Sequence, residues 1–379
     1  KLSSLNQFDL LVNCYNLFLE DISDKLQVDF LECRFGVNSN MLGADTGFEE
    51  VYNRSSSSKI QVRYFDNKSQ KTFKIFQGEL MTSDLWVTNR AQLLVKSAFF
   101  LDQQIQRVSN NSHNYDELST DEILRSRAIS ISVRLIFLYA IKTYGLILIN
   151  KVKRKMLGLD TKRWQVAYQS YQGVNSKLNN LIKINNLERR AFADPFIFFQ
   201  KNKSFCFVED YFYGDNKGKI SVLELSKKGS KFLGVVLEEK FHLSYPYVFS
   251  FKNRIFMVPE SSQSRQIRLY ECEDFPLKWK MCSVLIDNVE AVDTSLVRKN
   301  NIWYMLTNIC SSGIGDYNSE LHIFYSKDLM SKNWHPIRSG NPVIINSRKA
   351  RNGGIFKVKK DYYRIGQSQG YKNYGQSFS

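Results

Sequence analysis

From residue 193 onward, two apolar runs separated by a polar turn form a unit that recurs along the chain. The first runs of the four copies begin at residues 196, 247, 295 and 354, so the spacings are 51, 48 and 59 residues. Further apolar runs follow the first three pairs. A period of about 40–60 residues with several short strands per unit is typical of β-propeller blades. Four blades are visible. A fifth would need more chain after Ser379, a strand from near residues 163–168, or both.

A second pattern, over residues 116–187, predicts a helical connector. Residues 119–122 (STDE) offer a helix start, because a hydroxyl and two acids suit the unpaired N–H groups of a first turn. Residues 129–150 (ISISVRLIFLYAIKTYGLILIN) are long enough to span a bilayer. However, Arg134 and Lys142 interrupt this run on roughly one helical face, and a charge at mid-bilayer costs about 2.5–3.5 kcal/mol.

We therefore expect the apolar helix to be buried against the other domains. The alternative is a helix that lies on a membrane surface. The basic run at residues 151–155 (KVKRK) follows directly and suits anionic headgroups. Peripheral membrane contact through residues 129–155 is thus the second interpretation of this segment.

The N-terminal part mixes strand-like and helix-like stretches. Residues 59–64 and 72–76 resemble strands, whereas residues 48–52 resemble a helix, and this mixture predicts a small α/β unit. All six prolines lie after residue 194, which places a domain boundary near Arg190. The expected fold is α+β and multidomain but mainly β, with an α/β domain at 1–110, the helical connector at 116–187 and the propeller at 188–379.

The chain carries a formal net charge of +16, which attracts phosphates on nucleic acid, on anionic lipid or on a phosphorylated or nucleotide-linked sugar. The alternative is a solubility bias without any partner. The lysines are scattered, and the sequence contains neither a recognition-helix signature nor an RNA-binding aromatic motif. We therefore predict no nucleic-acid partner.

The six cysteines form no CxxC pair and lie at no metal-ligand spacing from a histidine. Most lie in apolar runs such as residues 204–207 (SFCF), which is typical of buried thiols in a reducing compartment. No signal peptide precedes them, and the chain begins without an initiator methionine, as a piece of a longer protein would. We expect a cytoplasmic protein, membrane-associated if the helix contacts lipid, with neither a metal nor a cofactor.

Polar clusters precede the apolar repeats, where the first strand of each blade begins, and these strands surround the central channel of a propeller. We predict that they form one pocket. The predicted catalytic residues are Asp194, Glu260 and Asp293. The predicted substrate-binding residues are His242, Ser244, Tyr245, Arg348 and Arg351. The structural alternative is that the aspartates cap turns and that the histidine is a satisfied core residue.

Two chemistries fit such a pocket. Paired carboxylates can act as acid and base on a glycosidic bond, with one pKa raised by burial. Alternatively, the carboxylates accept hydrogen bonds from sugar hydroxyls while Arg348 and Arg351 bind a phosphate. The basic balance of the chain favours the second chemistry.

Several stretches together resemble the N-terminal domain of glucosamine inositolphosphorylceramide transferases. They are residues 193–196 (ADPF), 242–249 (HLSYPYVF), 259–262 (PESS), 266–270 (QIRLY), 291–293 (AVD) and 321–326 (LHIFYS). The resemblance covers most of the predicted propeller. It implies five blades, distantly similar to glycoside hydrolase family 43, with a truncated C-terminus. It also implies a role in cell-surface glycan or glycolipid assembly, since bacterial proteins of the cell envelope carry similar domains.

The same resemblance disfavours ordinary hydrolysis. Asp194 matches the position of the general base in the hydrolase family, and Asp293 matches the acid that tunes its partner's pKa. Tyr245 stands where a further acid would be expected at the start of a blade. Glu260 lies one blade early for the general acid.

The first domain resembles the latter part of formyltransferases at residues 35–38 (FGVN), 47–52 (GFEEVY) and 60–63 (IQVR). In that family an Asn-x-His motif supplies the general base, whereas this chain has Asn38-Ser39-Asn40. The family's later catalytic aspartate falls near Ser69 and Gln70, where no acid aligns. The resemblance therefore implies a degenerate formyltransferase-like domain without formyl transfer.

We predict a carbohydrate-active protein whose propeller binds a phosphorylated or nucleotide-linked sugar for transfer. Asp194, Glu260 and Asp293 would contact sugar hydroxyls or serve as acid and base, and the basic residues would bind the anionic part. The alternatives are a non-catalytic glycan-binding module and a glycoside hydrolase with rearranged acids.

Overall fold

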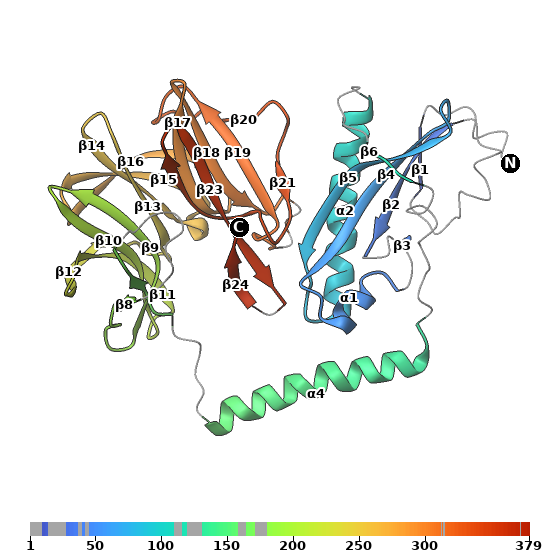
Figure 1. The fold of residues 1–379 in the computed structure, drawn as a ribbon, viewed down its shortest axis with the longest axis horizontal. Coiled ribbons are helices and arrows are strands. Elements are labelled where there is room, and N and C mark those ends of the chain that lie inside the picture. The colour runs from blue at the N-terminus through green and yellow to red at the C-terminus, as the bar shows by residue number, and fades with distance from the viewer. Residues whose placement is uncertain are drawn as a thin grey trace.

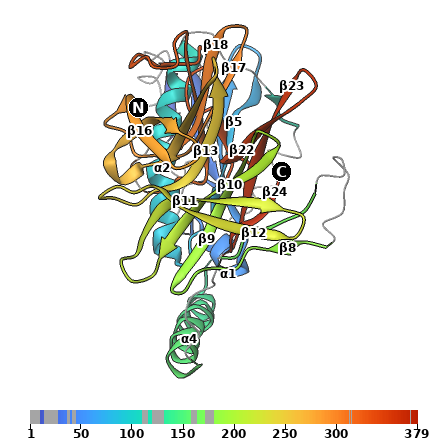
Figure 2. The ribbon, with the colours of Figure 1, turned by 90° about the vertical axis from the view of Figure 1, so that its left-hand side faces the viewer.

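The computed structural model describes residues 10–13, 28–36, 40–41, 45–109, 116–119, 131–157, 164–170, 180–311, 313, 315–371 and 373–379 (Figure 1). Two units stand side by side, a mixed α/β unit near the N-terminus and a larger all-β unit. A long helix, α4, lies below both of them in Figure 1 and in the perpendicular view of Figure 2.

The all-β unit consists of successive antiparallel sheets, each contributed by one stretch of chain. The first sheet contains β9 (Arg190–Gln200), β10 (Lys203–Phe212), β11 (Lys217–Ser226) and β12 (Gly229–Leu237), and the second contains β13 (Ser244–Phe251), β14 (Arg254–Glu260), β15 (Gln266–Asp274) and β16 (Lys278–Asp287), with the 3-10 turn η4 (Ser262–Ser264). The third sheet contains β17 (Ala291–Lys299), β18 (Ile302–Ile309), β19 (Glu320–Ser326), β20 (His335–Pro336) and β21 (Ile344–Ile345). The fourth sheet contains β22 (Arg351–Val358), β23 (Asp361–Gly370) and β24 (Asn373–Phe378). The predicted mainly β propeller is confirmed. Within the described residues it has four blades, and the fifth predicted blade is not among them.

Large apolar side chains fill the spaces between neighbouring blades. Phe256 and Val258 of the second blade pack with Trp303 and Met305 of the third, and all four are at most 4% exposed. Phe275 packs against aromatic rings of the first blade. These contacts follow from the repeat, because each second strand is a nearly continuous apolar run that is covered on both faces.

The α/β unit is a sheet of strand order β1-β2-β4-β5-β6, with β3 paired to β2. Its elements are β1 (Leu10–Asn13), β2 (Asp29–Phe35), β3 (Asn40–Met41), α1 (Phe48–Asn53), β4 (Ser57–Asp66), β5 (Lys71–Met81), α2 (Trp86–Ser109) and β6 (Asp116–Glu117). Helix α2 covers the sheet through Leu93 and Phe100, which pack on Ile60 and Leu80. Of the formyltransferase-like motif, Asn38 and Ser39 lie outside the described residues, and Ser69 and Gln70 lie in the turn between β4 and β5.

The connector contains helix α4 (Val133–Leu157) and the antiparallel pair of β7 (Ala167–Tyr168) and β8 (Ile182–Lys183). Tyr139 of α4 packs beside Phe48 and Trp86, and the ammonium of Lys142 donates to the carbonyl of Tyr52 over 2.6 Å. Our first expectation for this helix, burial against the other domains, is wrong. Over residues 133–149, Tyr139 is the one buried position, whereas Phe137 is 64% exposed.

The reason is that apolar side chains are spread around the helix, whereas the described contacts with the rest of the molecule lie along one side of it. Hydropathy along the chain does not reveal which side that is. None of the helices in the described part of the chain is both long and apolar enough to cross a membrane.

Candidate functional site

The innermost strand of each blade breaks its pairing at the same place. In β9, β13, β17 and β22, two residues are skipped between consecutive pairs with the second strand. The first skipped residue is Asp194, Tyr245 or Asp293 in the first three blades, with φ of 45°, 46° and 50°. This left-handed conformation is uncommon outside glycine, although aspartate tolerates it better than most residues. A bulge of this kind re-aims a side chain out of the regular alternation.

The bulges and the second strands bring three predicted carboxyl groups together around the guanidinium of a fourth predicted residue, Arg351. The Nε of Arg351 donates to Oδ2 of Asp293, and its Nη2 lies 3.9 Å from Oε2 of Glu260. Oδ2 of Asp194 accepts a hydrogen bond of 3.3 Å from the backbone N–H of Tyr245. The side chains of Arg351, Glu260 and Asp293 are 12%, 13% and 3% exposed. Three carboxylates and one cation from four different blades thus share a nearly dry site.

A cavity of about 440 Å³ opens beside this cluster. Its lining residues are Trp164, Gln165, Val166, Ala167, Phe192, Ala193, Asp194, Pro195, Glu209, Ser244, Glu260, Arg351, Gln367, Tyr374, Gly375 and Phe378. The guanidinium of Arg351 lies over the ring of Tyr374, 5.4 Å from its centre. A volume of this size suits a small molecule, and the aromatic groups of the wall combine with the charged floor to present both apolar and polar surface.

The surroundings of the site raise the pKa values of two of its carboxyl groups, Asp194 and Glu260. Burial, followed by the neighbouring charges of Asp293 and Glu209, raises the pKa of Asp194 to about 7. Burial and then Asp293 also raise the pKa of Glu260, although Arg351 opposes the shift. At neutral pH, Asp194 is therefore near its own midpoint, which is where a general acid or base works best. No cluster of three or more His, Cys, Asp or Glu side chains suited to a metal ion exists among the described residues.

Of the other predicted residues, Ser244, Tyr245, His242 and Arg348, only Ser244 lines the cavity. Ser244 lines the cavity, whereas Tyr245 is 3% exposed and places its hydroxyl 3.0 Å from Oγ of Ser295. The Nδ1 of His242 accepts a hydrogen bond of 2.9 Å from the backbone N–H of Gly218.

Arg348 is exposed, in a turn where its backbone N–H donates to Oδ1 of Asn346 over 2.8 Å. Neither His242 nor Arg348 is among the residues that line the cavity. Each precedes the strand of its own blade, whereas Arg351 is the first residue of β22.

Sequence reasoning missed Glu209. This residue lies opposite Ala193 in the first blade, and Glu260 lies opposite Ser244 in the second. Glu209 lines the cavity, and its Oε1 is 3.3 Å from Nε2 of His242. The signal was present in the sequence, because Glu209 and Glu260 end the same apolar run in consecutive repeats. Aligning the second strands as well as the first would have found it.

A family model described as the N-terminal part of glucosamine inositolphosphorylceramide transferase 1 matches residues 180–379. A relative of that name from Oryza sativa subsp. japonica is 36% identical over 180 residues, which are 46% of this chain and 24% of the relative. One from Arabidopsis thaliana is 32% identical over 197 residues, 51% of this chain and 25% of the relative. The chain thus spans about a quarter of the length of these relatives.

Solved structures with a similar arrangement include a galactosidase and a galactanase. A β-1,3-galactosidase of family GH43 has a TM-score of 0.44 and 15% identity, covering 52% of this chain and 45% of its own. An exo-β-1,3-galactanase from Phanerochaete chrysosporium has a TM-score of 0.45 and 10% identity, covering 59% and 60%.

Proposed function

The chain belongs, over residues 180–379, to the family of N-terminal domains of glucosamine inositolphosphorylceramide transferase 1, and on this basis we propose that its propeller binds a phosphorylated or nucleotide-linked sugar for transfer. The product would be a glycan or glycolipid of the cell surface. The observation that carries the proposal is the guanidinium of Arg351, which is held among three carboxylates and lines the cavity together with Asp194 and Glu260.

Each side chain in this cluster can make a contact or a proton transfer that suits an anionic sugar. A guanidinium has five N–H donors and binds phosphate oxygens in a fork geometry. The described hydrogen bonds of the Arg351 side chain go to Asp293 and Asn318, so donors remain for a ligand in the cavity. Glu260 and Glu209 are placed to accept hydrogen bonds from sugar hydroxyls. Asp194, with its raised pKa, would give or take the proton that moves when the sugar is transferred.

A thermal-shift screen tests this proposal. The ligands are free sugars, sugar phosphates, nucleotide-linked sugars, glycolipid headgroups and neutral oligosaccharides. We expect an anionic sugar to stabilise the protein by about 2.7 kcal/mol when its concentration is a hundredfold above its Kd. The matching neutral sugar should have a much smaller effect, because it lacks the group that Arg351 binds. Stabilisation by neutral oligosaccharides alone would favour the glycan-binding or hydrolytic alternatives instead.

We also propose that α4 contacts a membrane surface. Its sequence contains six basic residues and no acid. Ile136, Phe137, Ile141 and Leu148 are 40% or more exposed. Figure 2 shows the helix projecting below the rest of the molecule, so that a bilayer could reach it without displacing either unit. Basic side chains are attracted to anionic headgroups, and exposed apolar side chains gain free energy when they enter the boundary of headgroups and acyl chains.

Cosedimentation with vesicles checks the membrane proposal. We expect the protein to bind vesicles that contain phosphatidylglycerol and to bind neutral phosphatidylcholine vesicles much less. Phe137→Ser and Leu148→Ser should each weaken binding roughly tenfold, because a buried apolar side chain contributes about 1.5–3 kcal/mol. Phe199→Ser is the control, since Phe199 is 73% exposed on the propeller. Equal binding by all three variants would refute contact through α4.

A further inference from the structure

The α/β unit reaches into the propeller through one buried side chain. Lys96 of helix α2 has no exposed surface, and its ammonium contacts Oε1 of Glu320 and lies 3.3 Å from Oδ2 of Asp316. Glu320 is also fully buried and begins strand β19 of the third blade. A buried cation and two acids from separate units hold the loop before β19 against α2.

This ion cluster continues to Arg351 by two routes. In the first, Oδ1 of Asp316 accepts the backbone N–H of Asn318 over 2.9 Å, and Oδ1 of Asn318 lies 3.4 Å from Nη1 of Arg351. In the second, the amide of Asn308 donates to the carbonyl of Glu320 over 2.7 Å and to that of Ala350, next to Arg351, over 2.9 Å. Both the guanidinium and the backbone of Arg351 are therefore tied to groups that Lys96 holds.

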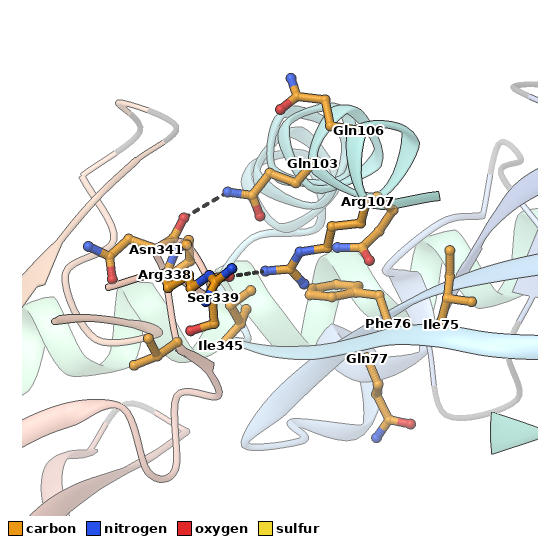
Figure 3. Close-up of a pocket in the computed structure, with 14 residues that line it drawn as sticks. Ile75, Phe76, Gln77, Gln103, Gln106, Arg107, Arg338, Ser339, Asn341 and Ile345 are labelled. Atoms are coloured by element: carbon orange, nitrogen blue, oxygen red, sulfur yellow. Dashed lines mark hydrogen bonds between the residues drawn. The ribbon is translucent and has the colours of Figure 1, made fainter. Parts of the chain in front are cut away.

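Two other contacts between the same two units lie away from Arg351. Figure 3 shows that the amide of Gln103 donates to the carbonyl of Asn341 and the guanidinium of Arg107 to that of Ser339, over 2.9 and 3.2 Å. These bonds cross a cleft of about 790 Å³ between α2 and the chain that leads to β21. Gln103 thus offers a matched control, because it joins the same two units away from Arg351.

We propose that Lys96 is a positioning residue of the propeller site, which fixes Arg351 among its carboxylates through Asp316, Asn318 and Glu320. The α/β unit then helps to position a side chain of the propeller site. Without Lys96, the buried Glu320 and the partly buried Asp316 lose their counter-charge, and the irregular loop at residues 315–319 has to move to hydrate them. The displaced loop no longer holds Asn318 against the guanidinium. The consequence for ligand affinity rests on the proposed function, but the effect on Arg351 does not.

The titration of Asp194 reports the position of Arg351 in the ligand-free protein. Asp194 on β9 faces Asp293 on β17 and Glu209 on β10, which raise its pKa, and Arg351, which lowers it. The other groups around the guanidinium are Glu260 on β14 and Tyr374 on β24, and Tyr245 on β13 donates to Asp194. If Arg351 moves away, the midpoint of Asp194 has to rise.

The experiment follows the side-chain carboxyl of Asp194 by carbon-13 NMR, with the signal assigned from its loss in Asp194→Asn. Lys96→Met and Asn318→Ala are both expected to raise the midpoint by about half a pH unit or more. Asn318→Ala removes no charge, so its effect has to pass through Arg351. Gln103→Ala should leave the midpoint unchanged. If Lys96→Met does not fold, Lys96→Gln, which can still donate to Glu320, takes its place.

A midpoint in the Lys96 variant equal to that of the unmodified protein would overturn the proposal, whether or not a sugar ligand has been found. Where the ligand screen succeeds, the Lys96 variant should also lose about 5- to 150-fold in affinity, the range typical of coupling between sites. A shifted midpoint in a protein that binds no sugar would support the positioning role and count against the proposed function alone.

Discussion

Replacing Arg351 by methionine is expected to destabilise the protein by about 3–5 kcal/mol at pH 7.5, because the substitution leaves buried carboxylates without their cation. Asp293 is 2% exposed and bonds directly to Arg351. Glu260 and Asp194 lose the one nearby charge that lowers their pKa values. Denaturant unfolding of the two proteins measures the difference.

The loss should depend on pH with a definite sign. Carboxyls whose folded-state pKa lies above the unfolded value bind more protons when folded, so their penalty is absent at low pH and grows as pH rises through the folded pKa. The pKa of Asp194 is already about 7, and removing Arg351 raises it further. The deficit of Arg351→Met should therefore be largest above pH 7 and shrink towards pH 4.

Arg348→Met is the matched control for this substitution. It removes the same charge three residues earlier, from an exposed side chain. Its effect on stability should stay within about 0.5 kcal/mol, as is usual at the surface. Equal stability of the two variants at pH 7.5 would show that Arg351 does not neutralise the buried acids.

Asp194→Asn is expected to slow sugar transfer by about 10²–10⁴-fold while changing ligand affinity by less than tenfold. Asparagine keeps the size of the side chain and can still accept the hydrogen bond of the Tyr245 N–H group, but it cannot exchange a proton. The rate with the ligand found in the screen and its Kd should be measured together. A large loss of rate with little change in Kd identifies Asp194 as a catalytic group, whereas a matching loss of affinity identifies it as a binding group.

The control for Asp194→Asn is Asp215→Asn, an exposed position of the first blade. We expect it to retain both rate and affinity. Full transfer activity in Asp194→Asn would show that this residue does not act as the acid or base. A protein that binds the sugar but shows no turnover in any form would instead agree with the non-catalytic binding module.

The blades and much of the site were predictable because both depend on a local pattern that repeats. Apolar runs separated by polar turns define the strands. The bulge that contains Asp194 in the first blade and Asp293 in the third recurs at the same place in each copy. Arg351 and Glu260 follow from the same register. Glu209 obeys this rule equally well and was missed only because the second strands were not compared.

Other features depend on tertiary contacts that no local pattern encodes. The exposure of α4 is one, because an apolar helix has the same sequence whether a protein core or a lipid surface covers it. The link between Lys96 and Glu320 is another, since it joins residues 224 positions apart in two separate units. Arg348 and Arg351 look alike in sequence, and only the start of β22 decides which of them faces the cavity.

The most direct test of the account is the location of the bound ligand. A crystal structure with the tightest anionic sugar from the screen should show its phosphate against Arg351 and its hydroxyls within hydrogen-bond distance of Asp194, Glu209 or Glu260. A sugar bound elsewhere, for example in the cleft beside Gln103 and Arg107, with the propeller cavity empty, would contradict the central claim.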